Sequence, residues 1–159
     1  MTTEPADRIH IVPGNFADPR VLGLLREHLA GMHGNSPPGS VYALGAAALQ
    51  APDVAFFTAW RAEALLGCAA LKYLDATSGE LKSMRTASAY LRQGVASQLL
   101  EHLLTLARSR GYTRVSLEIG SRPAFEPAIA LYRKRGFQNG PVFGDYLATD
   151  FNQFLHLDL

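Results

Sequence analysis

The residue pattern most suggestive of chemistry is the stretch from Tyr90 to Leu100, which reads Y-L-R-Q-G-V-A-S-Q-L-L. It follows an extended, half-polar segment and leads directly into an amphipathic helical pattern. The first N–H groups of a helix lack intrahelical acceptors, and the aligned peptide dipoles favour negative charge there. Gly94 allows a ligand to approach the backbone closely, and Ala96 adds almost no bulk. The stretch therefore predicts a site for a phosphate-bearing ligand.

The alternative for this stretch is a strand-to-helix turn that binds nothing, because many such turns contain a glycine and a small residue. No Gly-Lys-Ser/Thr follows, so it is not a Walker loop, and the G-x-G-x-x-G pattern of dinucleotide sites is absent. Cys68, the one cysteine, lies in the apolar run 64–71, which favours a buried inert thiol over a nucleophile. The five histidines show no metal-ligand spacing, so we expect no metal.

Composition places the chain among globular proteins. It has 159 residues, of which 48% are hydrophobic and 18% charged, and this suits one domain over residues 1–159 with a sizeable core. The net charge is +1 and the cations are scattered, so we expect no nucleic-acid partner. The first seven residues lack the apolar core of a signal peptide, and no apolar run approaches the about 20 residues that span a bilayer. We therefore expect a cytoplasmic protein without a membrane partner.

Hydrophobic periodicity predicts elements in the order β-α-α-β-β-β-α-β-α-β-β. The expected strands are 8–12, 54–61, 64–73, 79–85, 114–119, 142–143 and 154–157, and the expected helices are 18–34, 41–50, 95–110 and 124–135. A helical crossover joins strands 79–85 and 114–119, so these two should pair in parallel while the rest of the sheet is antiparallel. The predicted fold class is α/β (α+β), a mixed and mostly antiparallel sheet with packed helices.

Two segments carry a resemblance to a known family. The turn L-R-Q-G-V-A at 91–96 and the later helix A-I-A-L-Y-R-K-R-G-F at 128–137, together with the element order, resemble the GNAT superfamily of acyl-CoA-dependent N-acetyltransferases. The resemblance covers nearly the whole chain, and the N-terminal half is similar to a bacterial branch of small, poorly assigned members. It implies that acetyl-CoA is the cosubstrate.

The resemblance also implies where acetyl-CoA would bind. The pyrophosphate would lie on backbone N–H groups from Arg92 to Ser97, and the pantetheine arm would bond to the main chain around Met84 to Thr86. The acetyl group would lie where strands 79–85 and 114–119 splay apart. The implied cofactor contacts are Met84, Arg85, Thr86, Leu91, Arg92, Gln93, Gly94, Val95, Ala96, Ser97 and Tyr132.

Two positions depart from the family pattern. Leu91 stands where Gln or Arg is usual, and Phe125 stands where the second motif often has Asn. These departures support an alternative function, a degenerate GNAT domain that binds acyl-CoA as a sensor or interaction module without turnover. A structural or protein-interaction domain without a CoA site is a second alternative.

Three residues are candidates for catalysis. Tyr132 matches the family's tyrosine, and its phenol could donate a proton to the departing thiolate; the alternative is a core residue. Glu80 and Glu118 compete as general base, directly or through a water, and we favour Glu80 because it precedes the pantetheine segment. Both glutamates could instead be solvated strand carboxylates, and an amine with a near-neutral pKa would need no base. The oxyanion donor would be a main-chain N–H near Met84 or Arg85.

The predicted reaction is direct attack of an amine on acetyl-CoA in a ternary complex. The acceptor would be a small-molecule or peptide amine, and the resemblance implies that segments 28–44 and 140–154 recognise it. These segments offer His33, Asn35, Tyr42, Asp145, Tyr146 and Asp150. The assembly is either a monomer or a homodimer, a choice that the sequence leaves open.

Overall fold

The computed structural model describes residues 8–38 and 45–159. Its strands form one seven-stranded sheet with the order β1-β2-β3-β4-β5-β7-β6. The strands are β1 (His10–Pro13), β2 (Val54–Arg61), β3 (Ala64–Asp75), β4 (Ser78–Thr86), β5 (Arg114–Gly120), β6 (Gln138–Asn139) and β7 (Asn152–Asp158). The β4–β5 pair is parallel and the other pairs are antiparallel. The predicted mixed α/β sheet with a central parallel pair is therefore confirmed.

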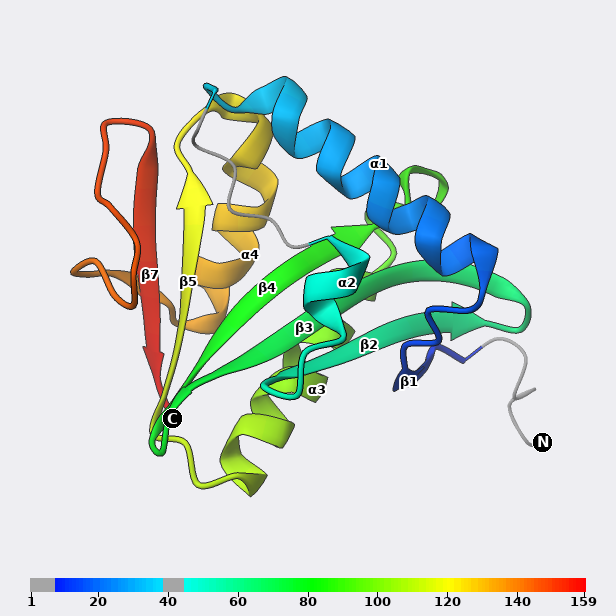
Figure 1. Ribbon diagram of the computed structural model, residues 1–159, viewed down its shortest axis with the longest axis horizontal. Coiled ribbons are helices and arrows are strands. Elements are labelled where there is room, and N and C mark those ends of the chain that lie inside the picture. The colour runs from blue at the N-terminus through cyan, green and yellow to red at the C-terminus, as the bar shows by residue number, and fades with distance from the viewer. Residues whose placement is uncertain (1–7, 39–44) are drawn as a thin grey trace.

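Helices cover both faces of this sheet (Figure 1). They are α1 (Pro19–Asn35), α2 (Ala46–Leu49), α3 (Val95–Ser109) and α4 (Glu126–Arg135), with short 3-10 turns at Ser88–Tyr90 and Pro123–Phe125. One core cluster joins α1 and α2 to β2 and β3 through Val21, Leu25, Leu49, Phe56 and Cys68. The second and larger cluster lies between the sheet and the pair α3 and α4. The sheet is thus the middle of three layers.

Local sequence explains where the principal helices begin and end. The carboxylate of Asp18 accepts a hydrogen bond from the Arg20 N–H at 2.9 Å, with Pro19 at the first helical position of α1. The apolar stripe of α3 is fully buried, as its period of 3.6 residues requires. Gly94 precedes α3 and Gly111 follows it, both with positive φ. No helix in the described ranges is long and apolar enough to cross a bilayer.

The C-terminal hairpin differs from the expected one. Residues 142–143 are not a strand, and β7 pairs instead with Gln138 and Asn139. Pro141 lacks an N–H group for a ladder, and the ring of Phe143 packs against Tyr146 and Phe154 rather than in a sheet. Of the expected helix 41–50, positions 41–44 lie outside the described residues and Ala46–Leu49 form α2.

Candidate functional site

The site begins where β4 and β5 separate. Their parallel pairing covers three positions and ends at Glu80 opposite Ser116, whereas β5 continues to pair with β7 as far as Gly120. Figure 1 shows the two strands close together at one end and far apart at the other, with α1 crossing the open end. The sheet therefore opens beside the C-terminal halves of both strands.

A β-bulge reshapes β4 at this opening. Cys68 pairs with Arg85 and Ala70 pairs with Lys82, so both Ser83 and Met84 lie opposite a single residue of β3. Ser83 has a φ of 55°, which is uncommon for a residue with a side chain. A bulge leaves an extra residue outside the regular ladder, so the β4 backbone here is available to a ligand.

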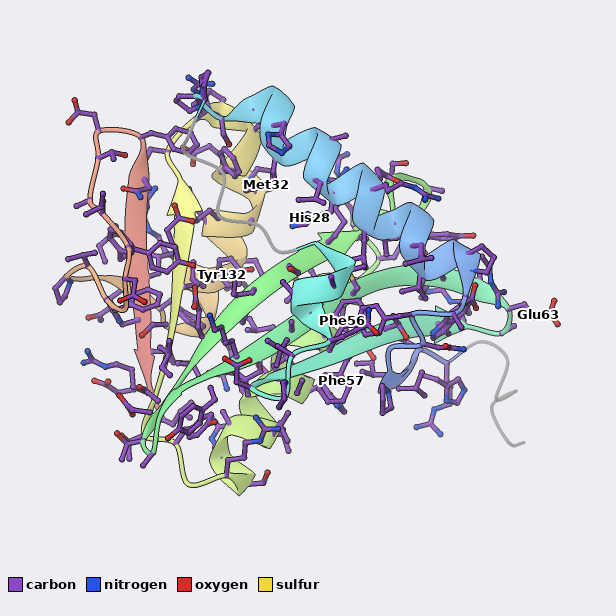
Figure 2. The ribbon with its side chains drawn as sticks, in the orientation of Figure 1. His28, Met32, Phe56, Phe57, Glu63 and Tyr132 are labelled. Carbon is purple, nitrogen blue, oxygen red and sulfur yellow. The ribbon has the colours of Figure 1, made fainter. Side chains whose placement is uncertain are left out.

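An inner cavity of about 100 Å³ occupies the opening. It lies between α1, β4, β5 and α4, and Figure 2 shows His28 and Met32 on the side of α1 that faces Tyr132. Its lining is His28, Met32, Glu80, Leu81, Lys82, Ser83, Met84, Leu117, Glu118, Ile119, Phe125, Tyr132 and Tyr146. Both predicted bases and the predicted acid thus border one small space.

An outer cleft of about 560 Å³ adjoins this cavity. It runs from the end of β4 past the start of α3 to α4, and Met84 and Tyr132 line both spaces. Its lining includes Met84, Arg85, Thr86, Leu91, Arg92, Gly94, Val95, Ala96, Ser97 and Tyr132. These are all of the expected cofactor contacts except Gln93, whose side-chain oxygen accepts a hydrogen bond from Arg61 at 3.0 Å.

The turn that borders the outer cleft has an unusual backbone. Arg92 has a φ of 62° and Gly94 a φ of 81°, so the chain enters α3 through left-handed conformations. Gly94 is the N-cap and makes no side-chain capping bond, which leaves the first N–H groups of α3 without such a partner. A helix terminus of this kind is suited to a phosphate group.

Glu80 is held in a buried polar network. The Tyr146 hydroxyl donates a hydrogen bond to Glu80 Oε2, and Lys82 Nζ lies 3.4 Å from the same oxygen. Lys82 Nζ also donates to the Tyr146 hydroxyl at 2.7 Å. Both charged side chains are more than nine-tenths buried, so each compensates the charge of the other.

Glu118 has a freer carboxylate than Glu80. Its Oε2 atom is buried and has no hydrogen-bond partner among residues 8–38 and 45–159. Burial raises the pKa of this carboxyl, and the charge of Glu80 adds to the effect, although Asn152 and Lys82 oppose it. A carboxylate with a raised pKa and an unused oxygen is suited to accept a proton.

Tyr132 lies at the junction of the two spaces and is 4% exposed. Burial raises the pKa of its phenol, so the group stays protonated across the physiological range. Its ring packs edge-on against Phe137, with centroids 5.5 Å apart. Phe125, the departure noted in the second motif, is a buried wall of the inner cavity.

Cys68 is a buried thiol, as predicted, and lies outside the lining of both spaces. Its Sγ donates a hydrogen bond to the Ser83 carbonyl at 3.3 Å. Burial raises the pKa of the thiol to about 12, which opposes formation of a nucleophilic thiolate.

Sequence reasoning missed three polar residues of the inner cavity, namely Lys82, His28 and the bulge residue Ser83. Lys82 follows Glu80 by two positions on one strand, so both face the same side of the sheet, and that spacing was a usable signal. His28 lies beside the apolar stripe of α1. A polar residue next to such a stripe is not distinguished by the amphipathic pattern, so its burial could not be predicted from it. His28 lies within the predicted acceptor segment 28–44 but had not been singled out.

Of the acceptor residues proposed from the sequence, Tyr146 lines the cavity. His33, Asn35, Asp145 and Asp150 are exposed and line neither space, and Tyr42 lies outside the described residues.

Comparison with known proteins places the chain in a family. Residues 23–137 match the family model described as "Acetyltransferase (GNAT) family". The chain belongs to the GNAT family of acetyltransferases. It is 47% identical over 138 residues to the Bacillus subtilis protein named "Uncharacterized N-acetyltransferase YsnE", an alignment that covers 87% of this chain and 91% of that one.

Solved structures show the same GNAT fold. An acetyltransferase from Streptococcus agalactiae aligns with a TM-score of 0.72 at 19% identity, covering 95% of this chain and 98% of that one. A GNAT family acetyltransferase from Elizabethkingia anophelis with acetyl-CoA bound aligns with a TM-score of 0.66 at 19% identity, covering 96% and 99%. These likenesses establish the fold of the chain.

Proposed function

We propose that this GNAT chain transfers the acetyl group of acetyl-CoA to an amine of a small molecule or peptide. One observation carries the proposal: the outer cleft and the inner cavity meet at Met84 and Tyr132. A donor whose phosphates lie at the start of α3 would thus present its thioester to a small space lined by two carboxylates. The GNAT structure that contains acetyl-CoA supports this choice of donor.

The chemistry is direct attack in a ternary complex. The amine nitrogen bonds to the thioester carbon, the carbonyl oxygen gains negative charge, and the carbon–sulfur bond then breaks. Backbone N–H groups at the bulge around Met84 and Arg85 stabilise the oxyanion. The bulge leaves this segment of β4 outside the regular ladder, which supports that role.

Two side chains move the protons. Glu118 takes the proton that the amine loses, directly or through a water, because its Oε2 is unused by the described residues. Tyr132 gives its proton to the thiolate of CoA and regains one from solvent. In this assignment Glu80 has an indirect role, because it positions Tyr146 and Lys82 in the cavity wall. This assignment shifts the base from Glu80, which the sequence favoured, to Glu118.

A panel of primary amines incubated with acetyl-CoA and the protein tests the function, with release of the CoA thiol as the readout. Amine-dependent release is the expected result. CoA binding without release from any amine would favour the acyl-CoA sensor. Thermal unfolding tests the other alternative, a structural or interaction domain without a CoA site. If the protein binds CoA, then CoA at 100 times its Kd should stabilise it by about 2.7 kcal/mol. No shift at millimolar CoA would indicate a domain without a CoA site.

A further inference from the structure

His28 is a buried polar residue for which the proposed chemistry has no role. It lies on α1, is 7% exposed, and lines the inner cavity with Glu80, Lys82 and Glu118. Its Nδ1 atom is buried and has no hydrogen-bond partner among the described residues. Buried polar atoms in proteins are nearly always hydrogen-bonded, and an unpaired one is costly. We therefore look for the hydrogen-bond partner of His28 Nδ1 in a ligand that enters the cavity.

The surroundings of His28 fix its charge state. Burial, together with a smaller effect of the nearby Arg85 guanidinium, lowers the pKa of the imidazole to about 4. Arg85 is held beside α1 by Glu27, with a distance of 3.2 Å between Nη2 and Oε1. The ring is thus neutral at physiological pH, with one N–H group and one nitrogen lone pair.

The charges of the cavity favour a cation. Glu80 and Glu118 each contribute a carboxylate, and Lys82 contributes one ammonium group that is already shared between Glu80 and Tyr146. With Glu118 ionised, these three side chains leave one negative charge uncompensated, and Arg85, the other cation near His28, is paired with Glu27. The unpartnered Oε2 of Glu118 and the unpartnered Nδ1 of His28 are both potential acceptors for the same N–H donors.

We propose that His28 is a specificity-determining residue that accepts a hydrogen bond from the ammonium group of the acceptor, beside Glu118 Oε2. The inference rests on the proposed function and narrows its acceptor to a primary amine that enters as a cation. A cavity of about 100 Å³ has room for the ammonium group and the first carbons of an unbranched chain. The amine is ready to attack once Glu118 has taken one ammonium proton, and His28 keeps the nitrogen oriented.

Binding can be tested without turnover. Protein labelled with 15N-histidine and saturated with CoA is titrated with butylammonium chloride, and 1-butanol serves as an uncharged ligand of similar size. The ring signals of His28 are identified by their loss in His28→Asn. Butylammonium should shift these signals, butanol should not, and Glu118→Gln should weaken the response. Ring signals that respond equally to both ligands, or to neither, would overturn the proposal.

Kinetics with an amine that the wild type acetylates provides a second test. His28→Leu removes both ring nitrogens and should raise the acceptor KM by about tenfold or more, because a hydrogen bond to a charged group is lost. His28→Asn retains a polar atom near the Nδ1 position and should recover most of that loss. The KM for acetyl-CoA should stay unchanged in both variants. If His28 had only a structural role, there would be no reason for the acceptor KM alone to change.

The two proposals fail in different ways. An unchanged acceptor KM in His28→Leu would overturn the role of His28 while the acetyltransferase function stands. Absence of thiol release from any amine would overturn the function, and the NMR titration would still decide whether His28 contacts a bound ammonium group.

Discussion

The Tyr146 hydroxyl donates a hydrogen bond to Glu80 Oε2, although 66 positions separate the two residues in the chain. This contact joins the irregular segment after β6 to the strand beside which the sheet opens. Lys82 completes the network from the same strand, 2.7 Å from the Tyr146 oxygen. Glu80 therefore has two partners for one oxygen, whereas Glu118 on the facing strand keeps an oxygen that no described residue uses.

The first prediction concerns Glu118 as the base. Glu118→Gln keeps the shape of the side chain and should lower kcat/KM by roughly 10²- to 10⁴-fold. In the wild type, the acidic limb of the kcat/KM profile should lie above the ordinary glutamate pKa of 4.5, because the pKa of Glu118 is raised. The profile of thiol release from pH 4 to pH 9 measures both effects.

Glu80→Gln is the matched control, and it should retain the acidic limb. If Glu80→Gln lost the acidic limb of the kcat/KM profile while Glu118→Gln kept the wild-type profile, Glu80 would be the general base. Unchanged profiles in both variants would mean that the amine arrives already deprotonated.

The second prediction concerns stability at the same position. The native state binds the Glu118 proton more tightly than the unfolded chain does, because its pKa is raised in the fold. The stabilising contribution of the protonated group is thus full below pH 4.5 and is lost as the pH rises through the raised pKa. Glu118→Gln should be at least as stable as the wild type at pH 7, with the difference shrinking toward pH 4. Urea unfolding at both pH values measures this, and a clear loss of stability at pH 7 would contradict it.

Tyr132→Phe gives the third prediction. Phenylalanine keeps the edge-on packing against Phe137 but has no proton to donate, so kcat should fall by roughly 10- to 10⁴-fold with little change in the acetyl-CoA KM. Tyr112→Phe is the control, since Tyr112 is also buried but lines neither the inner cavity nor the outer cleft. An unchanged kcat, with chemistry shown to be rate-limiting, would make Tyr132 a core residue.

The fourth prediction separates ligand binding from backbone strain at the start of α3. Gly94 and Gly111 flank this helix with φ values of 81° and 79°, and a Cβ at either position would meet nothing within 4 Å. Valine should strain the backbone similarly at both sites. Titration calorimetry should show that Gly94→Val abolishes CoA binding and that Gly111→Val retains it. Equal affinities in the two variants would remove the proposed phosphate site.

The fifth prediction excludes an acyl-enzyme on Cys68. Burial and a pKa near 12 keep the thiol protonated, so iodoacetamide at pH 7.5 should leave the native protein unmodified and label it only after unfolding. Cys68→Ala should retain the wild-type kcat. Rapid labelling of the native protein with loss of activity would point to a ping-pong reaction instead.

Regular patterns in the sequence explain how far the fold could be predicted. The stripe of Val95, Leu99 and Leu103 defines α3, and the crossover it forms requires the parallel β4–β5 pair. Strand β6 was missed because two polar residues show no alternation, and its pairing depends on β7, which comes later in the chain. Tyr146 lies in an irregular segment, so its contact with Glu80 depends on a loop path that no local pattern encodes.

Three residues with left-handed backbone, Ser83, Arg92 and Gly94, line the two adjoining spaces. Two of them are not glycine, so the torsion angles at this site are maintained by the surrounding fold rather than by residue type alone. Backbone N–H groups belong to the main chain, so the direction of these donors depends on the torsion angles and not on the type of the neighbouring side chains. The same torsions can be compared in the solved structures of chains that share 19% of their residues with this one. A search for more distant relatives would gain from comparing the signs of φ at these three positions.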